Sequence, residues 1–370
     1  MPAVNLGENE GALVSVIIPA YNGSQFIERT LVSVCSQTYR NLEILVINDG
    51  STDDTADIAE RLARADPRLR VITTANRGVA AARNHGVECA AGDYVAFVDA
   101  DDLWHPTKIA KQMAALARHG DDESWGAVYT FHRVIDINDY FLRNGSRYAV
   151  GGYILARHLV MKFVGNGSSL LVRKKAFWAA GGYEPAYAAA GIGGCEDLDF
   201  ELRIASGHRV EVVPEMLVGY RSYEGNMSSN RSRMVAGLKA VTENCIAANA
   251  WLPYYVKRLA RAQSQRYAAE KFALDKRGGQ VLRAMLLILP KDPLLFFLFL
   301  LEFFVRRKGR DALIGIWYGA LKKAPPVRRS YYDFDPAAGA SFSWPWFWRY
   351  RHWQLEKADK QAENRIFADR

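Results

Sequence analysis

Residues 94–102 read Tyr-Val-Ala-Phe-Val-Asp-Ala-Asp-Asp, a short apolar run that ends in carboxylates. Such a run, rich in Val and aromatic residues and preceded by Gly92, is typical of a buried strand. Side chains alternate along an extended backbone, so we expect Asp99 and Asp101 to point to the same side. Carboxylates so placed suit Mn²⁺ or Mg²⁺ that also binds substrate phosphates. An isolated Asp-x-Asp is more often a solvated acidic turn, so the surrounding sequence is needed to distinguish a metal site from such a turn.

Earlier segments share this strand character, and helical patterns separate them. We expect strands at 13–18, 42–47 and 69–73, and helices at 26–35, 52–64 and 79–91. Strands separated by helices of about 10–15 residues predict right-handed βαβ units and a mostly parallel sheet. Ligands bind such sheets at the carboxyl ends of the strands. Polar residues follow three of these strands, which favours a metal and phosphate site at that edge: Pro19, Tyr21 and Asn22; Asn48, Asp49, Gly50 and Ser51; and Asp99, Asp101 and Asp102.

The rest of the chain divides into two kinds of pattern. Strand patterns at 127–135, 168–172 and 209–213 and a helix at 196–206 continue the same domain, whereas helical patterns dominate from residue 230 onward. The sequence therefore predicts an α/β fold followed by a C-terminal α-helical region.

Asp49 and Arg83 each have two interpretations. The stretch around Asp49 is either the start of a helix, capped by Ser51 or Thr52, or a ligand contact in which Asp49 accepts a hydrogen bond from a nucleobase imide. Arg83 lies on the helix before the Asp-x-Asp strand, and on its own it is more typical of a surface arginine.

Glu196 and Asp197 open a predicted helix. Carboxylates in a first helical turn are commonly simple partners of the helix dipole. The preceding stretch at 188–194 is rich in Gly and Ala, however, and such a loop favours a lid that admits a substrate. We expect the helix N-terminus to keep Asp197 ionised.

Charge is unevenly distributed along the chain. Lysine and arginine number 22 against 28 acidic residues in 1–225, and 26 against 12 in the remainder. The acidic first part argues against a nucleic acid partner. The cysteines lack metal-ligand spacing, and the N-terminal residues lack the pattern of a signal peptide, so we expect a cytoplasmic protein.

An apolar run at 294–305 ends in Arg306, Arg307 and Lys308. A spanning helix needs about 17 apolar residues or more, so this run is too short to span a membrane. One interpretation is an in-plane or re-entrant helix pair at 281–289 and 294–305, anchored at an anionic membrane surface by the basic residues at 306–310 and the aromatic residues at 344–353. The alternative is a buried helical hairpin that covers the first domain.

Several of these stretches resemble family 2 inverting glycosyltransferases, which have the GT-A fold, a Rossmann-like and mostly parallel sheet with flanking helices. The resemblance covers about residues 13–229 and rests on motifs in a fixed order. They are Val-Ser-Val-Ile-Ile-Pro-Ala-Tyr-Asn at 14–22, Asn-Asp-Gly-Ser-Thr-Asp at 48–53, Ala-Arg-Asn at 82–84 with Ala-Gly-Asp-Tyr-Val-Ala-Phe-Val-Asp-Ala-Asp-Asp at 91–102, and Gly-Gly-Tyr at 181–183 with Glu-Asp at 196–197.

The resemblance implies a division of the chain and a role for each motif. Residues 1–229 would form the catalytic domain, with a nucleotide-binding half at about 12–103 and an acceptor half at about 104–229, and residues 230–370 the helical region. The implied metal ligands are Asp101 and Asp99, and the implied nucleotide contacts are Pro19, Tyr21, Asn22, Asp49, Arg83, Asp99 and Arg221. Asp197 would be the catalytic base, with Glu196 beside it.

The function implied is transfer of a sugar from a nucleotide sugar, most simply a UDP-sugar, with Mn²⁺ or Mg²⁺ as cofactor. The acceptor would be a glycan or lipid-linked hydroxyl in cell-surface polysaccharide synthesis, on the inner face of the cell membrane, where the protein would be peripheral. Two alternatives remain. One is a catalytically inactive sugar-nucleotide-binding or scaffold protein of the same fold. The other is a nucleotidyltransferase, which would need a glycine-rich basic loop where the sequence has Pro19 to Asn22.

Overall fold

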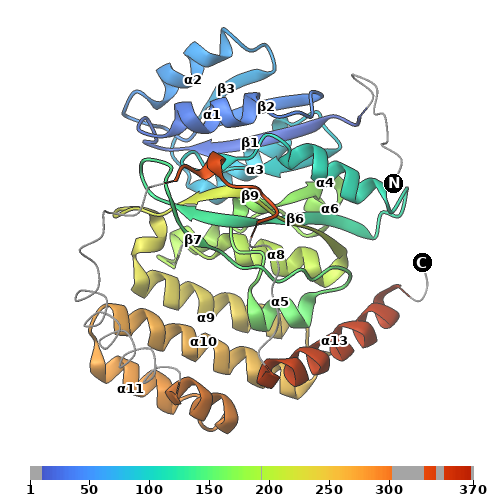
Figure 1. Ribbon diagram of the computed structural model, residues 1–370, viewed down its shortest axis with the longest axis vertical. Coiled ribbons are helices and arrows are strands. Elements are labelled where there is room, and N and C mark those ends of the chain that lie inside the picture. Colours follow the sequence, from blue (N-terminus) through green and yellow to red (C-terminus); the bar gives the residue numbers. More distant parts are fainter. Residues whose placement is uncertain (1–10, 193, 302–328, 339–345, 368–370) are drawn as a thin grey trace.

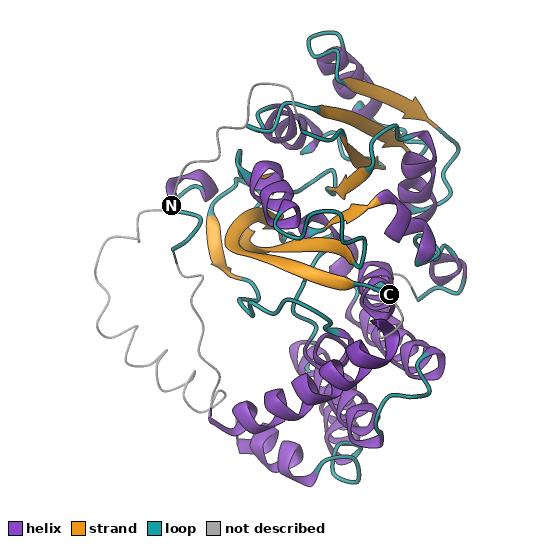
Figure 2. Cartoon of the chain, turned by 90° about the vertical axis from the view of Figure 1, so that its right-hand side faces the viewer, coloured by secondary structure: helices purple, strands orange, loops and turns teal. Residues whose placement is uncertain are grey.

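The computed structural model describes residues 11–192, 194–301, 329–338 and 346–367. In Figure 1 a twisted sheet flanked by helices forms the upper part, and helices from the C-terminal part of the chain lie stacked below it. Figure 2 shows the same division from the side, with the strands gathered above the helical stack. The α/β architecture with a helical C-terminal region agrees with the sequence analysis.

The first half of the sheet is parallel. β1 (Val14–Ala20) pairs with β2 (Leu42–Asn48) and β4 (Tyr94–Phe97), and β3 (Leu69–Thr73) pairs with β2. The connecting helices are α1 (Ile27–Cys35), α2 (Thr55–Ala63) and α3 (Val79–Cys89). β1 is buried on both faces, because Ile17 enters the core that contains α3 while Val16 and Ile18 enter the core on the other face. The carboxyl ends of β1, β2 and β4 therefore meet at one edge.

The second half of the sheet is mixed. β8 (Leu171–Arg173) runs antiparallel to β4 and to β6 (Trp125–Ile135), and β9 (Arg209–Arg221) runs parallel to β6. β5 (Leu103–Trp104) and β7 (Phe141–Asn144) pair antiparallel with β9 and β6. The strand order is β3-β2-β1-β4-β8-β6-β9-β5.

β9 is longer than the segment 209–213 that the sequence predicts. Its pattern is interrupted at Pro214, which has no N–H for the sheet, and the register with β6 shifts at this point before pairing resumes. The continuation carries Arg221 to the edge where β1, β2 and β4 end.

The remaining helices of this part surround the sheet. They are α4 (Lys108–Ala117), α5 (Leu155–Met161), α6 (Lys174–Ala179), α7 (Ala186–Ala189) and α8 (Glu196–Gly207), with short 3-10 helices at Gly167–Ser169, Met227–Ser229 and Tyr331–Asp333. α7 begins before the predicted lid at 188–194 and overlaps only its first two residues, and residue 193 of that segment lies outside the described residues.

α2 begins at Thr55, three residues later than the helix predicted at 52–64, so capping by Ser51 or Thr52 is wrong. Side-chain oxygens hold these two residues in the preceding turn instead. Asn48 Oδ1 accepts from the Ser51 N–H at 3.1 Å, and Asn22 Oδ1 accepts from the Thr52 N–H at 2.8 Å. Local side-chain bonds of this kind compete with helix formation, and here they join the ends of β1 and β2.

The C-terminal helices are α9 (Arg231–Ala248), α10 (Tyr254–Leu274), α11 (Gly278–Leu286), a helix at 293–301 and α13 (Trp346–Phe367). α10 packs against α9, α11 and α5, and α13 packs against α5. The helix predicted at 281–289 begins and ends three residues earlier, and residues 302–310 of the apolar and basic segment lie outside the described residues. Within the described part, no helix is both long and apolar enough to cross a membrane.

Two contacts attach the end of the chain to the α/β part. Tyr331, which is 1% exposed, packs against Leu103 and Ile135 beside β9. On α13, Asp359 pairs with Arg157 Nε at 2.7 Å and accepts from the N–H of Ala156 at 2.6 Å. The Asp359 carboxylate on α13 therefore accepts hydrogen bonds from backbone N–H groups at the start of α5, which have no partner within that helix.

Candidate active site

A cavity of about 890 Å³ lies at the edge where β1, β2 and β4 end. The N-terminus of α8 and the end of β9 close it from the other half of the sheet, and α9 and α10 add Met234, Leu238 and Tyr267. The structure brings all the residues predicted for the site to this cavity: Pro19, Tyr21, Asn22, Asp49, Arg83, Asp99, Asp101, Glu196, Asp197 and Arg221.

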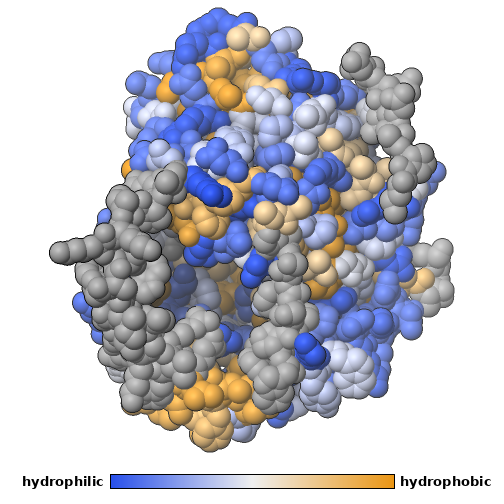
Figure 3. Space-filling view, in the orientation of Figure 1, coloured by the Kyte–Doolittle hydropathy of each residue, from blue (hydrophilic) through white to orange (hydrophobic). Residues whose placement is uncertain are grey.

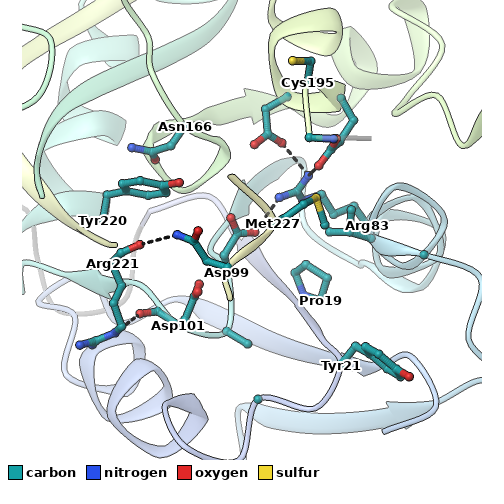
Figure 4. A pocket seen from close by; sticks show the side chains of 18 of the residues that line it. Pro19, Tyr21, Arg83, Asp99, Asp101, Asn166, Cys195, Tyr220, Arg221 and Met227 are labelled. Atoms are coloured by element: carbon teal, nitrogen blue, oxygen red, sulfur yellow. Dashed lines mark hydrogen bonds and ion pairs between the residues drawn. The ribbon is translucent and has the colours of Figure 1, made fainter. Parts of the chain in front are cut away.

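Arg83 joins the two groups of carboxylates in the cavity (Figure 4). Its guanidinium donates to Asp197 Oδ1 through Nη1 and to Asp99 Oδ1 through Nη2, both at 2.6 Å. The residue is 1% exposed and lies over the Tyr183 ring at 4.8 Å, so it is not a surface arginine. Burial opposes its charge, yet the carboxylates of Asp197 and Asp99 keep the pKa of Arg83 well above its ordinary value.

Asp99, Asp101 and Asp102 form a carboxylate cluster whose oxygens lie within 4.8 Å of one another. Burial and the neighbouring Asp99 raise the pKa of Asp101 to about 6, although Tyr223 and Arg221 act in the opposite direction. Carboxylates that crowd each other in this way are relieved by a divalent cation, and hard oxygen ligands are those that Mn²⁺ and Mg²⁺ prefer. The residues present therefore fit such an ion.

Asp102 has a different role in the cluster. It is fully buried, its Oδ2 accepts from the Ser168 hydroxyl at 2.6 Å, and its Oδ1 accepts from the Arg221 N–H at 2.9 Å. Ser168 also accepts from the Asp99 N–H at 3.0 Å. Asp102 thus fixes the turn that presents Asp99 and Asp101.

Asp197 lies in the first turn of α8, where its Oδ2 accepts from the Gly167 N–H at 3.2 Å. Burial raises its pKa to about 8, although Arg83 acts in the opposite direction. A helix end contributes only ~0.3–1 kcal/mol at exposed sites, so the first-turn position alone does not offset this burial, and the ion pair with Arg83 is the contact that most favours the ionised form of Asp197. Glu196 is 9% exposed, and its Oε2 accepts from the Gly194 N–H at 2.8 Å.

The ends of β1 and β2 form another part of the wall. Tyr21 is 54% exposed, and Asn22 has a φ of 49° that allows its side chain to reach Thr52. Asp49 is 3% exposed and accepts from the N–H groups of Arg77 and Gly78, both at 2.8 Å. Asp49 therefore anchors the loop that begins α3, the helix of Arg83.

Arg221 uses its guanidinium to connect the rim to neighbouring loops. Nε donates to the backbone oxygen of Asp101 at 2.6 Å, and Nη1 donates to that of Asp136 at 2.7 Å. Nη1 also pairs with Asp139 at 2.6 Å. These contacts position the Asp101 backbone.

Sequence analysis missed several residues that line the cavity. Lys162 and Asn166 come from the segment between α5 and β8, and Tyr267 comes from α10. No motif or periodicity marks them, because long-range packing alone brings them to the rim. Tyr223 also lines the cavity, and its proximity in sequence to the predicted site residue Arg221 is a signal that could have identified it.

Residues 15–174 match the family described as Glycosyl transferase family 2. This part of the chain is similar to family 2 glycosyltransferase domains. The match includes the site residues from Pro19 to Asp101 and ends before Glu196 and Asp197.

Relatives of the family 2 domain share its sequence over part of their length. The uncharacterized glycosyltransferase YibD of Escherichia coli is 49% identical over 94 residues, which is 25% of this chain and 27% of the relative. Hyaluronan synthase of Pasteurella multocida is 34% identical over 137 residues, or 37% of this chain and 14% of the relative. The chain thus matches less than a third of either relative.

A solved structure has the same fold. The crystal structure of GalNAc-T7 with UDP, GalNAc and Mn²⁺ has a TM-score of 0.50 and 19% sequence identity, over 70% of this chain and 51% of that one. The likeness is one of fold, and with the family 2 domain it places the chain in the GT-A class.

Proposed function

We propose that the chain is an inverting glycosyltransferase that moves a sugar from a nucleoside diphosphate, most simply UDP, to an acceptor hydroxyl. The observation that carries the proposal is the Arg83 bridge. One buried guanidinium binds Asp99 of the metal-binding cluster and Asp197 of α8, so it places a carboxylate on each side of one reaction space. A family 2 domain and a carboxylate cluster that fits a divalent ion support it further.

Each part of the site has a task in this reaction. Asp49, Pro19, Tyr21 and Asn22 line the part of the cavity assigned to the nucleoside. Asp101 and Asp99 would hold Mn²⁺ or Mg²⁺, and the bound ion neutralises negative charge on the departing diphosphate. Asp197, held by Arg83 and the Gly167 N–H, takes the proton of the acceptor hydroxyl.

The bonds change at one carbon. The acceptor oxygen forms a bond to the anomeric carbon as the bond from that carbon to the diphosphate oxygen breaks, and the proton goes to Asp197. Attack from the face opposite the leaving group inverts the configuration. Burial favours the base role because it raises the pKa of Asp197, so the carboxylate binds a proton more strongly than an exposed one does, while the ion pair with Arg83 favours the ionised form that a base requires.

The binding test uses UDP with and without Mn²⁺ in calorimetry. We expect Mn²⁺ to strengthen UDP binding, and Asp101→Ala to remove that strengthening while the protein stays folded. The control is Asp122→Ala, which changes an exposed acidic residue outside the cavity. Equal effects of Mn²⁺ on the wild type and on Asp101→Ala would contradict the metal site. UDP binding without turnover of any UDP-sugar would favour the inactive, scaffold alternative.

We also propose an anionic membrane surface as a partner, with a glycan or lipid-linked acceptor presented there on the inner face of the membrane. Large apolar side chains on α11 and the following segments face solvent, and Figure 3 shows apolar residues gathered at the lower edge where Figure 1 places α11. These side chains are 37–63% exposed: Leu282, Leu286, Leu287, Leu289, Leu294, Phe297 and Leu301. We call this set the apolar face.

The surroundings of the apolar face favour lipid over a second copy of the chain. Leu294 shares a groove with Tyr350 and Arg258, and the exposed Tyr350 and Trp353 rings lie 5.9 Å apart. Exposed aromatic rings beside basic side chains are typical of the headgroup region. The sequence adds basic residues at 306–310, which would attract anionic lipid and repel another copy.

The liposome test compares vesicles that contain phosphatidylglycerol with vesicles of phosphatidylcholine alone. We expect sedimentation with the anionic vesicles at ~0.15 M salt, and its loss in the Leu286→Glu, Phe297→Glu double variant. Leu142→Glu, which changes a 53% exposed leucine on β7, is the matched control. An unmodified protein that stays in the supernatant would contradict the membrane proposal.

A further inference from the structure

Part of the cavity wall carries hydrogen-bond donors in place of carboxylates. Lys162 follows α5 with a φ of 50°, and its Nζ donates to the backbone oxygen of Leu159 at 3.3 Å. No carboxylate among the described residues forms an ion pair with Lys162. Burial lowers its pKa to about 8, which means that its charge is poorly compensated in the protein alone.

Asn166 adds an unused donor four residues further on. It is 6% exposed and lines the cavity, and Figure 4 shows it beside Tyr220. Its Oδ1 accepts from the Ser169 hydroxyl at 3.0 Å, whereas its Nδ2 has no partner within the described residues. A buried donor without an acceptor costs ~1–3 kcal/mol, so this amide favours a ligand that accepts a hydrogen bond.

Lys271 of α10 approaches the same region from the helical part. Its Nζ lies 5.1 Å from the centroid of the Tyr267 ring, which lines the cavity. No ion pair of Lys271 is found in the part of the chain that the structure describes. Lys271 itself does not line the cavity, and its link to the cavity wall is this contact with Tyr267.

These cations are not needed to balance the catalytic carboxylates. Arg83 already pairs with Asp99 and Asp197 and lies 3.9 Å from Glu196. The donor diphosphate has its own partner in the ion that Asp99 and Asp101 would hold. An anion from another molecule is therefore the ligand that this wall lacks.

We propose that Lys162, Asn166 and Lys271 bind an anionic group of the acceptor, a phosphate or a carboxylate close to the attacking hydroxyl. This inference rests on the proposed function and specifies its acceptor class. The shared chemistry has two sources, the diphosphate of a lipid-linked sugar and the carboxylate of an acidic sugar. Tyr267, with Lys271 against its ring, would form the side of this subsite.

The experiment uses calorimetry on the full chain saturated with UDP and Mn²⁺, so that the donor site is filled. The probes are N-acetylglucosamine linked to octyl diphosphate, with octyl N-acetylglucosaminide as its neutral counterpart, and methyl glucuronide, with methyl glucoside as its counterpart. We expect one anionic probe to bind at least about tenfold more tightly than its neutral counterpart. The probe that does so identifies the source of the charge.

Variants separate this subsite from general attraction. Lys162→Met with Lys271→Met is expected to reduce the preference for the anionic probe to less than about twofold and to leave UDP affinity unchanged. Lys271→Met alone changes a partly exposed position and is expected to reduce the preference for the anionic probe by a smaller factor. Lys239→Met on α9 removes one exposed lysine and is the control of equal charge for the single variant Lys271→Met.

Three results would overturn the inference. They are equal affinity for charged and neutral probes, a preference that the lysine variants leave intact, and an equal loss in Lys239→Met. A fall of UDP affinity in the lysine variants would assign these residues to the donor and would also overturn it. Failure of the wild type to bind UDP with Mn²⁺ would instead contradict the proposed function.

Discussion

Arg83 determines how the carboxylates of Asp99 and Asp197 lie relative to each other. It is the shared partner of Asp99 and Asp197, and its own position depends on α3, whose first turn follows the loop that Asp49 anchors. A change at Asp49 would therefore reach Asp197 through Arg77, Gly78 and α3. The part of the cavity wall that contains Asp49 and the part that contains Asp197 are thus connected through one charged side chain.

Asp197→Asn tests whether Asp197 takes the proton of the acceptor. The amide keeps the shape of the side chain but does not take the proton, so we expect hydrolysis of a UDP-sugar, with water as the acceptor, to fall by ~10²-fold or more. UDP binding with Mn²⁺ should persist, because Asp99 and Asp101 are unchanged. Asp199→Asn is the control, since the Asp199 carboxylate bonds Tyr187 and Arg203 outside the cavity. Retention of more than about a tenth of the rate by Asp197→Asn would place the base elsewhere.

The site residues differ in how far the sequence predicts them. Pro19, Asp49 and Asp99 follow directly from strand ends in βαβ units, because the carboxyl ends of parallel strands share one edge. Lys162 and Asn166 have no local signal, since only the packing of α5 and β8 brings them there. The raised pKa of Asp197 depends on burial by the whole fold, and a first-turn pattern contains no information about that burial.

At the scale of elements, α3 lies unusually close to the sheet. A Cβ on Gly86 would lie 2.4 Å from Cγ2 of Ile17 in β1 and 3.1 Å from Cγ1 of Ile47 in β2. The missing side chain allows α3 to approach both strands, and this approach sets the depth at which Arg83 enters the cavity.

Gly86→Ala tests this close packing. Ile17 would have to move within a filled core, so we expect the free energy of unfolding in urea to fall by ~1–3 kcal/mol. The matched control is Gly207→Ala at the end of α8, where a Cβ meets nothing within 4 Å and the change is expected to be neutral or stabilising. Equal stability of Gly86→Ala and the wild type would show that α3 can shift without cost.

The bounds of some helices and strands agree with those that the sequence predicts, and others differ. The strands at 42–47 and 69–73 agree with β2 and β3 to within one residue, because each is a buried run between turn residues. α2 starts late because Asn22 and Asn48 hold the preceding turn, and β9 runs long because a register shift carries it past Pro214. Both differences arise from contacts with distant segments.

At the scale of the whole molecule, α13 is attached to the α/β part through a buried ion pair. The Asp359 side chain is 1% exposed and the Arg157 side chain is 10% exposed. Among the described residues, Asp359→Ala would leave the buried Arg157 side chain with only the Tyr153 backbone oxygen as a partner, so we expect a loss of ~3–5 kcal/mol of stability.

Urea denaturation measures this loss, and proteolysis between Pro336 and Trp346 reports whether α13 has detached. The control is Lys360→Ala, which removes an exposed i,i+4 pair with Glu356 and is expected to change stability by ~0.5 kcal/mol or less. Unchanged protease resistance in Asp359→Ala would show that apolar contacts alone hold α13 in place.

The contact between Asp359 and the start of α5 also determines when, during synthesis of the chain, this part of the structure can form. Asp359 and Ala156 are 203 positions apart in the chain, and ribosomes add ~5–20 residues per second, so the second group emerges ~10–40 s after the first. During that interval the Arg157 charge lacks its carboxylate. The contact between α5 and α13 therefore forms only after Asp359 has been synthesised, and a ribosome that stalls before Asp359 releases a product in which Arg157 lacks its ion-pair partner.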